Sequence, residues 1–298
     1  VIMEIKLKKF KSVLLVSFII LMLAFLGFYL SIYRPKFDLN IFNSYESEYL
    51  NFIENSRYIF MTPKNNVGID TGIIFYPGGL VDEKSYLPLL VELCKDGYGV
   101  YILKSPFKLP ILNQDGAEKI IKENYFSKYV LMGHSLGGTS MLKYFSKQTE
   151  LSNKIEDIIL LASYSDGSYI FDSTKNDNYR RDIDMLSIVG TNDKIIDIEK
   201  YEYDKSNLDR DTKYLFIDGG NHSYFSNYGK QHNDGEATIS IEQQQHFVLN
   251  EVEKFLNESK WIRFIFLFLY NIFLHESVIY VCVHDAGSGG GVGVDEVG

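Results

Sequence analysis

The pentapeptide Gly-His-Ser-Leu-Gly at residues 133–137 constrains the fold of this chain more than any other feature. The apolar run 129–132 before it predicts a short buried strand, and residues 138–145 after it predict a helix. Small residues around a serine permit the sharp strand-to-helix turn that holds a hydroxyl out at the top of a sheet. We therefore predict that Ser135 is a nucleophile on such a turn. The alternative is a glycine-rich turn with a solvated serine.

Strand-like and helix-like runs alternate from residue 57 to residue 256. Several predicted strands are continuously apolar, as at 100–103 and 158–161, which suits a parallel sheet buried on both faces. The alternation predicts an α/β fold, a mostly parallel sheet with helices on both faces. The short polar gap between 163 and 185 leaves room for only a minimal cap. The predicted strands are 58–61, 72–76, 99–103, 129–132, 157–163, 185–189 and 213–218, and the predicted helices are 85–95, 117–124, 136–147, 198–206 and 241–256.

The two partners that a serine nucleophile needs follow two later strands. A base must take the serine proton, and an acid must orient that base. Asp193 follows the strand 185–189, and His222 follows the strand 213–218. With Ser135, both lie beyond the carboxyl ends of strands, where open α/β sheets place their sites. We predict that these three residues form a catalytic triad in the chain order nucleophile, acid, base.

Other acids and histidines are alternatives for these roles. Asp166, after the strand 157–163, is the rival acid, and Asp197 is a more distant one. His134 lies in the turn itself, and we expect its side chain to point away from the site. His232 and His246 flank the last predicted helix and are expected at the surface.

An oxyanion that develops during acyl transfer needs preorganised donors. The backbone N–H of Leu136 is the first candidate, because this residue follows the nucleophile at a helix N-terminus. The second donor should come from the loop directly after the strand 72–76, where glycines let the main chain approach a substrate carbonyl. We predict Gly79 for this role, with Leu80 as the alternative.

Two polar residues follow this loop. Asp82 is predicted to cap the helix that begins near Ser85, which is the commoner use of aspartate at such a position. The alternative is that Asp82 and Tyr86 shape the rim of a substrate pocket. The aromatic stretch 224–228 either lines that pocket or packs as an aromatic loop.

Residues from about 70 to 256 resemble the α/β-hydrolases, in particular a small bacterial subgroup with few or no cap insertions. The resemblance implies the α/β-hydrolase fold, serine-hydrolase activity and the triad and oxyanion roles given above, and this chemistry needs no metal or organic cofactor. Members of the subgroup are mostly hydrolases or esterases without a settled substrate, so the resemblance names none. It rests on the segments Tyr76-Pro77-Gly78-Gly79-Leu80-Val81-Asp82, Gly133-His134-Ser135-Leu136-Gly137-Gly138, Gly190-Thr191-Asn192-Asp193, Gly219-Gly220-Asn221-His222 and 228–240.

Residues 13–33 are almost unbroken apolar sequence, long enough at ~1.5 Å per residue to cross a bilayer core of ~30 Å. Four lysines precede this run, so we expect the lysine-rich side in the cytoplasm and the body outside a bacterial cell membrane. We predict an uncleaved single-pass anchor at 1–36, and the alternative is a cleaved signal peptide. A stalk at 37–56 and a hydrolase domain at 57–259 are predicted to follow.

The remaining residues, 260–298, have no predicted role. The stretch 264–283 is apolar and aromatic, but His275, Glu276 and Ser277 interrupt it. A charge in the middle of a bilayer costs about 2.5–3.5 kcal/mol, so a second span is not predicted. A membrane-surface segment and a sequence artefact are both open interpretations.

The charge distribution excludes one class of partner. The chain has a net charge of −9, and residues 1–36 carry +5 of the total, which leaves −14 for the rest. So acidic a body is a poor match for nucleic acid, which needs clustered lysine and arginine. Cys94 and Cys282 lie far apart, no cysteine or histidine spacing suggests a metal site, and Cys94 is expected to be buried.

These features predict a membrane-anchored serine hydrolase that cleaves an ester, thioester or related acyl bond through an acyl-enzyme on Ser135. Its substrate would be a small-molecule or lipid-like acyl compound. One alternative is a catalytically silent hydrolase-fold protein that binds a ligand or partner at the cell surface. Another is an acyltransferase that uses the same triad. The sequence does not predict an oligomeric state.

Overall fold

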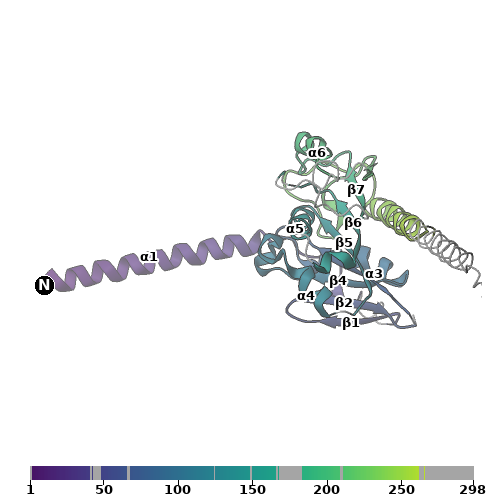
Figure 1. Ribbon diagram of the computed structural model, residues 1–298. Coiled ribbons are helices and arrows are strands. Elements are labelled where there is room, and N and C mark those ends of the chain that lie inside the picture. Colours follow the sequence, from purple (N-terminus) through teal and green to yellow (C-terminus); the bar gives the residue numbers. More distant parts are fainter. Residues whose placement is uncertain are drawn as a thin grey trace, which may run out of the picture. The chain divides into compact units, whose positions relative to one another are not determined.

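A single eight-stranded sheet organises the described part of the chain in this computed structural model (Figure 1). The described residues are 2–40, 42, 48–65, 68–123, 125–147, 150–165, 167, 183–208, 211–261 and 265. The strand order is β1-β2-β4-β3-β5-β6-β7-β8. β2 runs antiparallel to β1 and β4, and the other neighbouring pairs are parallel. The strands are β1 Leu50–Glu54, β2 Tyr58–Pro63, β3 Thr71–Tyr76, β4 Gly99–Leu103, β5 Lys128–His134, β6 Ile155–Leu161, β7 Asp184–Gly190 and β8 Lys213–Ile217.

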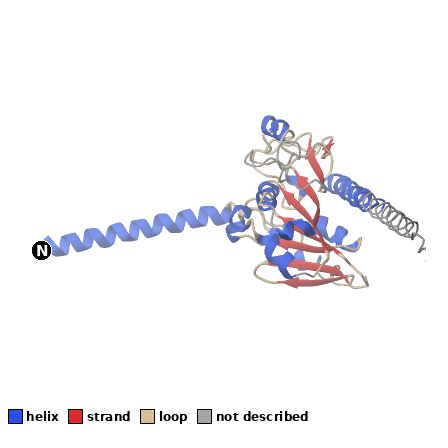
Figure 2. Ribbon diagram, viewed as in Figure 1, coloured by secondary structure: helices blue, strands red, loops and turns tan. Residues whose placement is uncertain are grey.

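Helices cover both faces of this sheet (Figure 2). Successive residues of a strand point to opposite faces, and β3 shows both contacts. Ile74 and Tyr76 belong to the same buried cluster as Met141 of α5. Phe75, on the other face, packs its ring 4.7 Å from that of Tyr86, just before α3. The α-helices of the sheet region are α3 Leu87–Lys95, α4 Gly116–Glu123, α5 Leu136–Phe145 and α6 Ile198–Asp204, and residues 241–261 are also helical.

The predicted α/β architecture is confirmed, and all seven predicted strands are present within one or two residues. β3 and β4 are buried along their whole length because helices lie on both sides of them. The structure adds β1, an edge strand that lies inside the segment predicted as a stalk. The sheet therefore begins earlier in the chain than the sequence analysis places it.

The first helix, α1 Ile2–Leu30, contains the predicted apolar span. Residues Phe10–Leu30 are long and apolar enough to cross a membrane, and none of them is buried in the protein. A signal sequence near an N-terminus would have the same properties. Shortly after this helix, Tyr33 forms a parallel β-bridge with Val81.

Contacts divide the chain into a compact unit up to Glu253 and a second unit from Lys254 onward, whose described residues are helical. The predictions for Asp166, Cys282, most of the gap 168–182 and nearly all of the tail 260–298 fall outside the described residues.

Candidate active site

The turn that carries Ser135 joins β5 directly to α5, as predicted. Ser135 has φ 52° and ψ −129°, a conformation that residues other than glycine rarely adopt. Its N–H donates to the Leu161 carbonyl at 2.9 Å, and its carbonyl accepts the Ser163 hydroxyl at 2.8 Å. Neighbouring backbone and side chains thus hold the serine in a strained turn, which strands and helices tolerate mainly at functional sites.

A glycine allows this turn to pack against the next loop of the site. A Cβ atom at Gly137 would overlap the carbonyl oxygens of Tyr76 and Pro77. Because backbone atoms cannot move aside as a flexible side chain can, only glycine fits there. α5 therefore begins in direct contact with the end of β3, where the predicted oxyanion loop starts.

His222 and Asp193 form a buried pair. The His222 Nδ1 atom lies 2.7 Å from Asp193 Oδ2, and the two side chains are 2% and 0% exposed. The other carboxylate oxygen of Asp193 accepts the N–H groups of Ile195 and Ile196 at 2.8 and 2.9 Å. An ionised Asp193 can only accept hydrogen bonds, so Nδ1 of His222 carries the proton and Nε2 is left as a base.

The loop that presents His222 is held by two residues for which the sequence analysis predicts no role. Asp234 accepts the N–H of His222 at 3.3 Å, and both the N–H and the hydroxyl of Ser223 at 2.8 Å. Gln244 accepts the Asn221 N–H at 3.0 Å and donates to the Asn221 carbonyl at 2.8 Å. Asp234 lies in the stretch 228–240 that carries part of the family resemblance, and this was the available signal.

The alternative acid Asp197 has a different function. It is the N-cap of α6, where it accepts the Lys200 N–H at 3.2 Å, and its side chain pairs with the Lys200 ammonium at 3.0 Å. These contacts with Lys200 lower the pKa of its carboxyl. The histidines predicted at the surface, His232 and His246, are exposed. Cys94 is buried, as expected.

The prediction that His134 points away from the site is wrong. Its side chain is fully buried, and its ring centroid lies 4.6 Å from that of His222. Its Nδ1 atom lies 2.8 Å from the Tyr86 hydroxyl oxygen, which accepts the Gly78 N–H at 2.9 Å. As the last residue of β5, His134 follows the strand alternation and shares a face with Met132, which brings it under the oxyanion loop.

Burial fixes the protonation of this pair. It lowers the pKa of His134 well below its usual value, with a further contribution from His222, and it raises the pKa of the Tyr86 phenol. Both groups are therefore neutral at neutral pH, and the Tyr86 O–H donates to Nδ1 of His134. The remaining ring nitrogen, Nε2, has no hydrogen-bond partner among the described residues. A connected chain thus runs from the Gly78 N–H through Tyr86 to the histidine beside His222.

The two predicted oxyanion donors lie next to each other. A Cβ atom at Gly79 would lie 2.9 Å from Leu136 Cδ2. Leu136 is the first residue of α5, so its N–H has no acceptor within the helix. The alternative donor, Leu80, already donates its N–H to the Lys108 carbonyl at 2.7 Å. This occupied N–H favours Gly79 over Leu80.

The residues after this loop support the sequence analysis in part. Asp82 is the N-cap of a short 3-10 helix, Glu83–Tyr86, and accepts the Lys84 N–H at 3.0 Å, which confirms its predicted capping role. Tyr86 is fully buried and therefore does not form a pocket rim. In the 224–228 stretch, Phe225 is also buried and lies 5.5 Å from the His134 ring.

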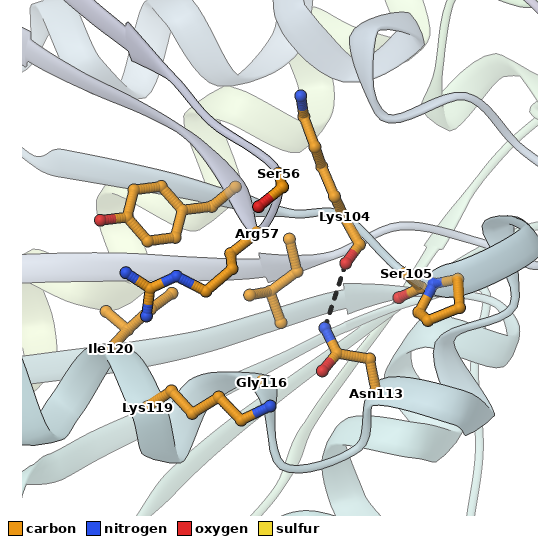
Figure 3. A pocket seen from close by; sticks show the side chains of 11 residues that line it. Ser56, Arg57, Lys104, Ser105, Asn113, Gly116, Lys119 and Ile120 are labelled. Carbon is orange, nitrogen blue, oxygen red and sulfur yellow. Dashed lines mark hydrogen bonds between the residues drawn. The ribbon is translucent and has the colours of Figure 1, made fainter.

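One cavity of about 300 Å³ lies elsewhere, between the start of β2, the end of β4 and α4 (Figure 3). Its polar lining includes Arg57, Lys119 and Asn113, whose amide donates to the Lys104 carbonyl at 3.2 Å. Arg57 is paired with Glu123 at 2.8 Å. The cavity contains none of the predicted catalytic residues, so it is not the predicted site.

This sheet order, the strained serine turn after β5 and the histidine–aspartate pair after β7 and β8 together define the class of α/β-hydrolases. The sequence profile described as "Alpha/beta hydrolase family" matches residues 72–246, more than half of the chain, and the protein belongs to this family. The predicted α/β-hydrolase fold is thereby confirmed.

Solved structures agree with this fold. A predicted CIB-like hydrolase from Thermoplasma acidophilum is 15% identical over 69% of this chain and 97% of its own, with a TM-score of 0.51. A thermostable esterase from Pseudomonas putida is 14% identical over 73% of this chain and 88% of its own, with a TM-score of 0.48. The mouse alpha/beta hydrolase domain-containing protein 10 is 15% identical over 70% and 98%, also with a TM-score of 0.48. No curated protein sequence matches the chain significantly.

Proposed function

We propose that this protein is a serine hydrolase that cleaves an ester, thioester or related acyl bond through an acyl-enzyme on Ser135. The buried contact of 2.7 Å between His222 and Asp193 is the observation that carries the proposal. Such a pair supplies an oriented base, and Ser135 lies on the strained turn at the same edge of the sheet. Membership of the α/β-hydrolase family supports a hydrolase, and the triad assignment is the finer part of the proposal.

In the first half of the reaction, the Ser135 hydroxyl oxygen attacks the acyl carbon while Nε2 of His222 takes the hydroxyl proton. The negative charge that forms on the carbonyl oxygen is stabilised by the N–H groups of Gly79 and Leu136. Collapse of this intermediate breaks the bond to the alcohol or thiol, which leaves with the proton from His222. Asp193 stabilises the charged imidazole and holds its orientation throughout.

In the second half, His222 takes a proton from water, and the resulting hydroxide oxygen attacks the acyl carbon of the acyl-enzyme. The bond to the serine oxygen breaks, Ser135 regains a proton from His222, and the carboxylic acid leaves. Every proton moves through one imidazole, which is why Nδ1 must stay bonded to Asp193 while Nε2 changes partner.

We also propose that α1 anchors the catalytic body to the outside of a membrane. The exposed apolar residues Phe10–Leu30 and the lysines that precede them support a single span with the N-terminus in the cytoplasm. A hydrolase in this position would meet small-molecule or lipid-like acyl substrates at the membrane.

A fluorophosphonate probe tests the catalytic part of the proposal, because it reacts with activated serines. We expect the full chain in detergent to be labelled, Ser135→Ala to lose labelling, and His222→Ala to be labelled weakly. His246→Ala, at an exposed histidine, should match the unchanged protein. Equal labelling of Ser135→Ala, or no labelling of the folded unchanged protein, would reject the catalytic role, and the second result would favour a ligand-binding protein.

A further inference from the structure

The chain between the candidate membrane span and the catalytic body is very short. α1 ends at Leu30, and only Ser31 and Ile32 separate it from Tyr33. The Tyr33 N–H donates to the Leu80 carbonyl, and the Asp82 N–H donates to the Tyr33 carbonyl, both at 2.8 Å. Because three residues extend at most about 10 Å, these bonds hold the oxyanion loop within that distance of the end of the span.

Further contacts fix the same junction to the other side of the site. The Tyr33 ring packs 5.1 Å from the Tyr228 ring, and its hydroxyl oxygen accepts the His232 N–H at 3.1 Å. The Lys36 N–H donates to the Asn227 carbonyl at 2.8 Å. The junction is therefore bonded to the oxyanion loop and to the region that follows His222, and it does not act as a free stalk.

A loop beside this junction exposes three large apolar side chains. Phe107, Ile111 and Leu112 are 62%, 47% and 53% exposed, within the stretch 106–112. Phe107 and Lys108 both have φ 55°, which is unfavourable for residues other than glycine. Clustered exposed apolar side chains of this kind mark surfaces that contact a partner or a membrane.

The loop is continuous with the candidate span. The Phe107 ring lies 6.0 Å from the Phe28 ring, edge to face, and Phe28 is in the last turn of the span. A span that crosses a bilayer would therefore place Phe107 at the depth of its own last turn. The Lys108 ammonium, the cation nearest to this ring in sequence, is paired with Asp82 at 3.1 Å and with Glu83, so its charge is compensated.

From these contacts we propose that the loop 106–112 inserts Phe107, Ile111 and Leu112 into the membrane leaflet from which α1 emerges. The bilayer surface is then the occupant of this apolar patch, and transfer of its side chains out of water favours insertion. The inference rests on the membrane anchoring proposed above. Because Leu80 bonds to the Lys108 carbonyl, insertion also holds the oxyanion loop at the lipid surface, where acyl chains of membrane lipids are the available substrates.

Fluorescence quenching in lipid nanodiscs tests the insertion on the full chain. In a Cys282→Ser background, which leaves the buried Cys94, single cysteines at Phe107→Cys, Leu21→Cys and Tyr203→Cys receive an environment-sensitive dye. Leu21 is a position within the span, and Tyr203 on α6 is an apolar side chain that is 72% exposed outside the loop. We expect brominated lipids to quench the dyes at 107 and 21, and aqueous iodide to quench the dye at 203.

The outcomes separate the two proposals. Bromolipid quenching at 21 together with iodide quenching at 107 would overturn loop insertion and keep the membrane anchor. Failure of bromolipid quenching at both positions would overturn the anchor and the insertion together. Fluorophosphonate labelling of the same samples reports on Ser135 independently of either result.

Discussion

The two sides of the candidate site are held in place by different means. The nucleophile side is local: β5, the turn at Ser135 and α5 are continuous in sequence, and Gly137 sets the closeness of their packing. The oxyanion side is assembled from distant segments, because Tyr33 and Lys108 bond to Leu80 from opposite directions along the chain. One side is thus encoded in a short motif, whereas the other depends on long-range contacts.

This difference separates what each side requires. A local turn survives changes elsewhere as long as the sheet folds. A loop held by Tyr33 depends on a segment next to the candidate membrane span, so its geometry is linked to how the chain leaves the membrane. The predictions below test the two sides separately.

The largest expected effect is on the nucleophile side. Asp193→Asn keeps an oxygen for the Ile195 and Ile196 N–H groups but offers an N–H to His222. The imidazole then carries its proton on Nε2 and cannot accept the serine proton. We expect kcat to fall by about 10⁴-fold with the melting temperature nearly unchanged. Asp197→Asn, at the exposed α6 cap, is the matched control, and a comparable loss there would assign the acid role differently.

An intermediate effect is expected on the oxyanion side. A chain that begins at Phe37 lacks both hydrogen bonds between Tyr33 and the loop 80–82, whereas a chain that begins at Ser31 keeps them. Two hydrogen bonds at about 1 kcal/mol each correspond to roughly a 30-fold loss of kcat for a soluble ester. Both soluble chains are assayed with the same p-nitrophenyl ester, and KM should change less than kcat.

Equal kcat values for these two chains would show that the oxyanion loop holds its shape without Tyr33. The contrast between a local side and an assembled side would then be lost. A Tyr33→Phe variant of the longer chain sharpens the result, because it keeps the backbone bonds and removes only the hydroxyl that accepts the His232 N–H. It should retain most of the activity.

The same contrast explains what the sequence could predict. The strands, Ser135, Asp193 and His222 follow from apolar runs and strand ends, which are local signals. β1 was not predicted, because it is a short edge strand whose residues are mostly exposed and so lack an apolar run.

Features that depend on long-range pairing left no such signal. The bridge between Tyr33 and Val81 joins segments far apart in sequence, and neither segment has a pattern that indicates the other. The position of His134 beside His222 depends on how two loops meet above the sheet. Asp234 shows its role only through the N–H groups that surround it.

The smallest expected effect concerns His134, which connects the two sides through Tyr86 and His222. Burial lowers the pKa of His134 in the folded protein, whereas the unfolded chain has a histidine pKa of about 6.5. The unfolded state therefore binds more protons below about pH 6.5. This contribution to stability is fully present above that pH and is lost as the pH falls below it, by at most about 1.4 kcal/mol per pH unit.

His134→Gln removes this titration and keeps an acceptor for the Tyr86 hydroxyl. The free energy of unfolding, measured by urea titration between pH 7.5 and 5, should fall less steeply in the variant than in the unchanged protein. The difference between the two proteins is the informative quantity, because Glu253 titrates in the same range. A hydrogen bond with Asp96 raises its pKa to about 7, so Glu253 favours folding as the pH falls. Identical pH dependence in both proteins would mean that His134 takes up its proton without unfolding, and that the link between the two sides is looser than its contacts indicate.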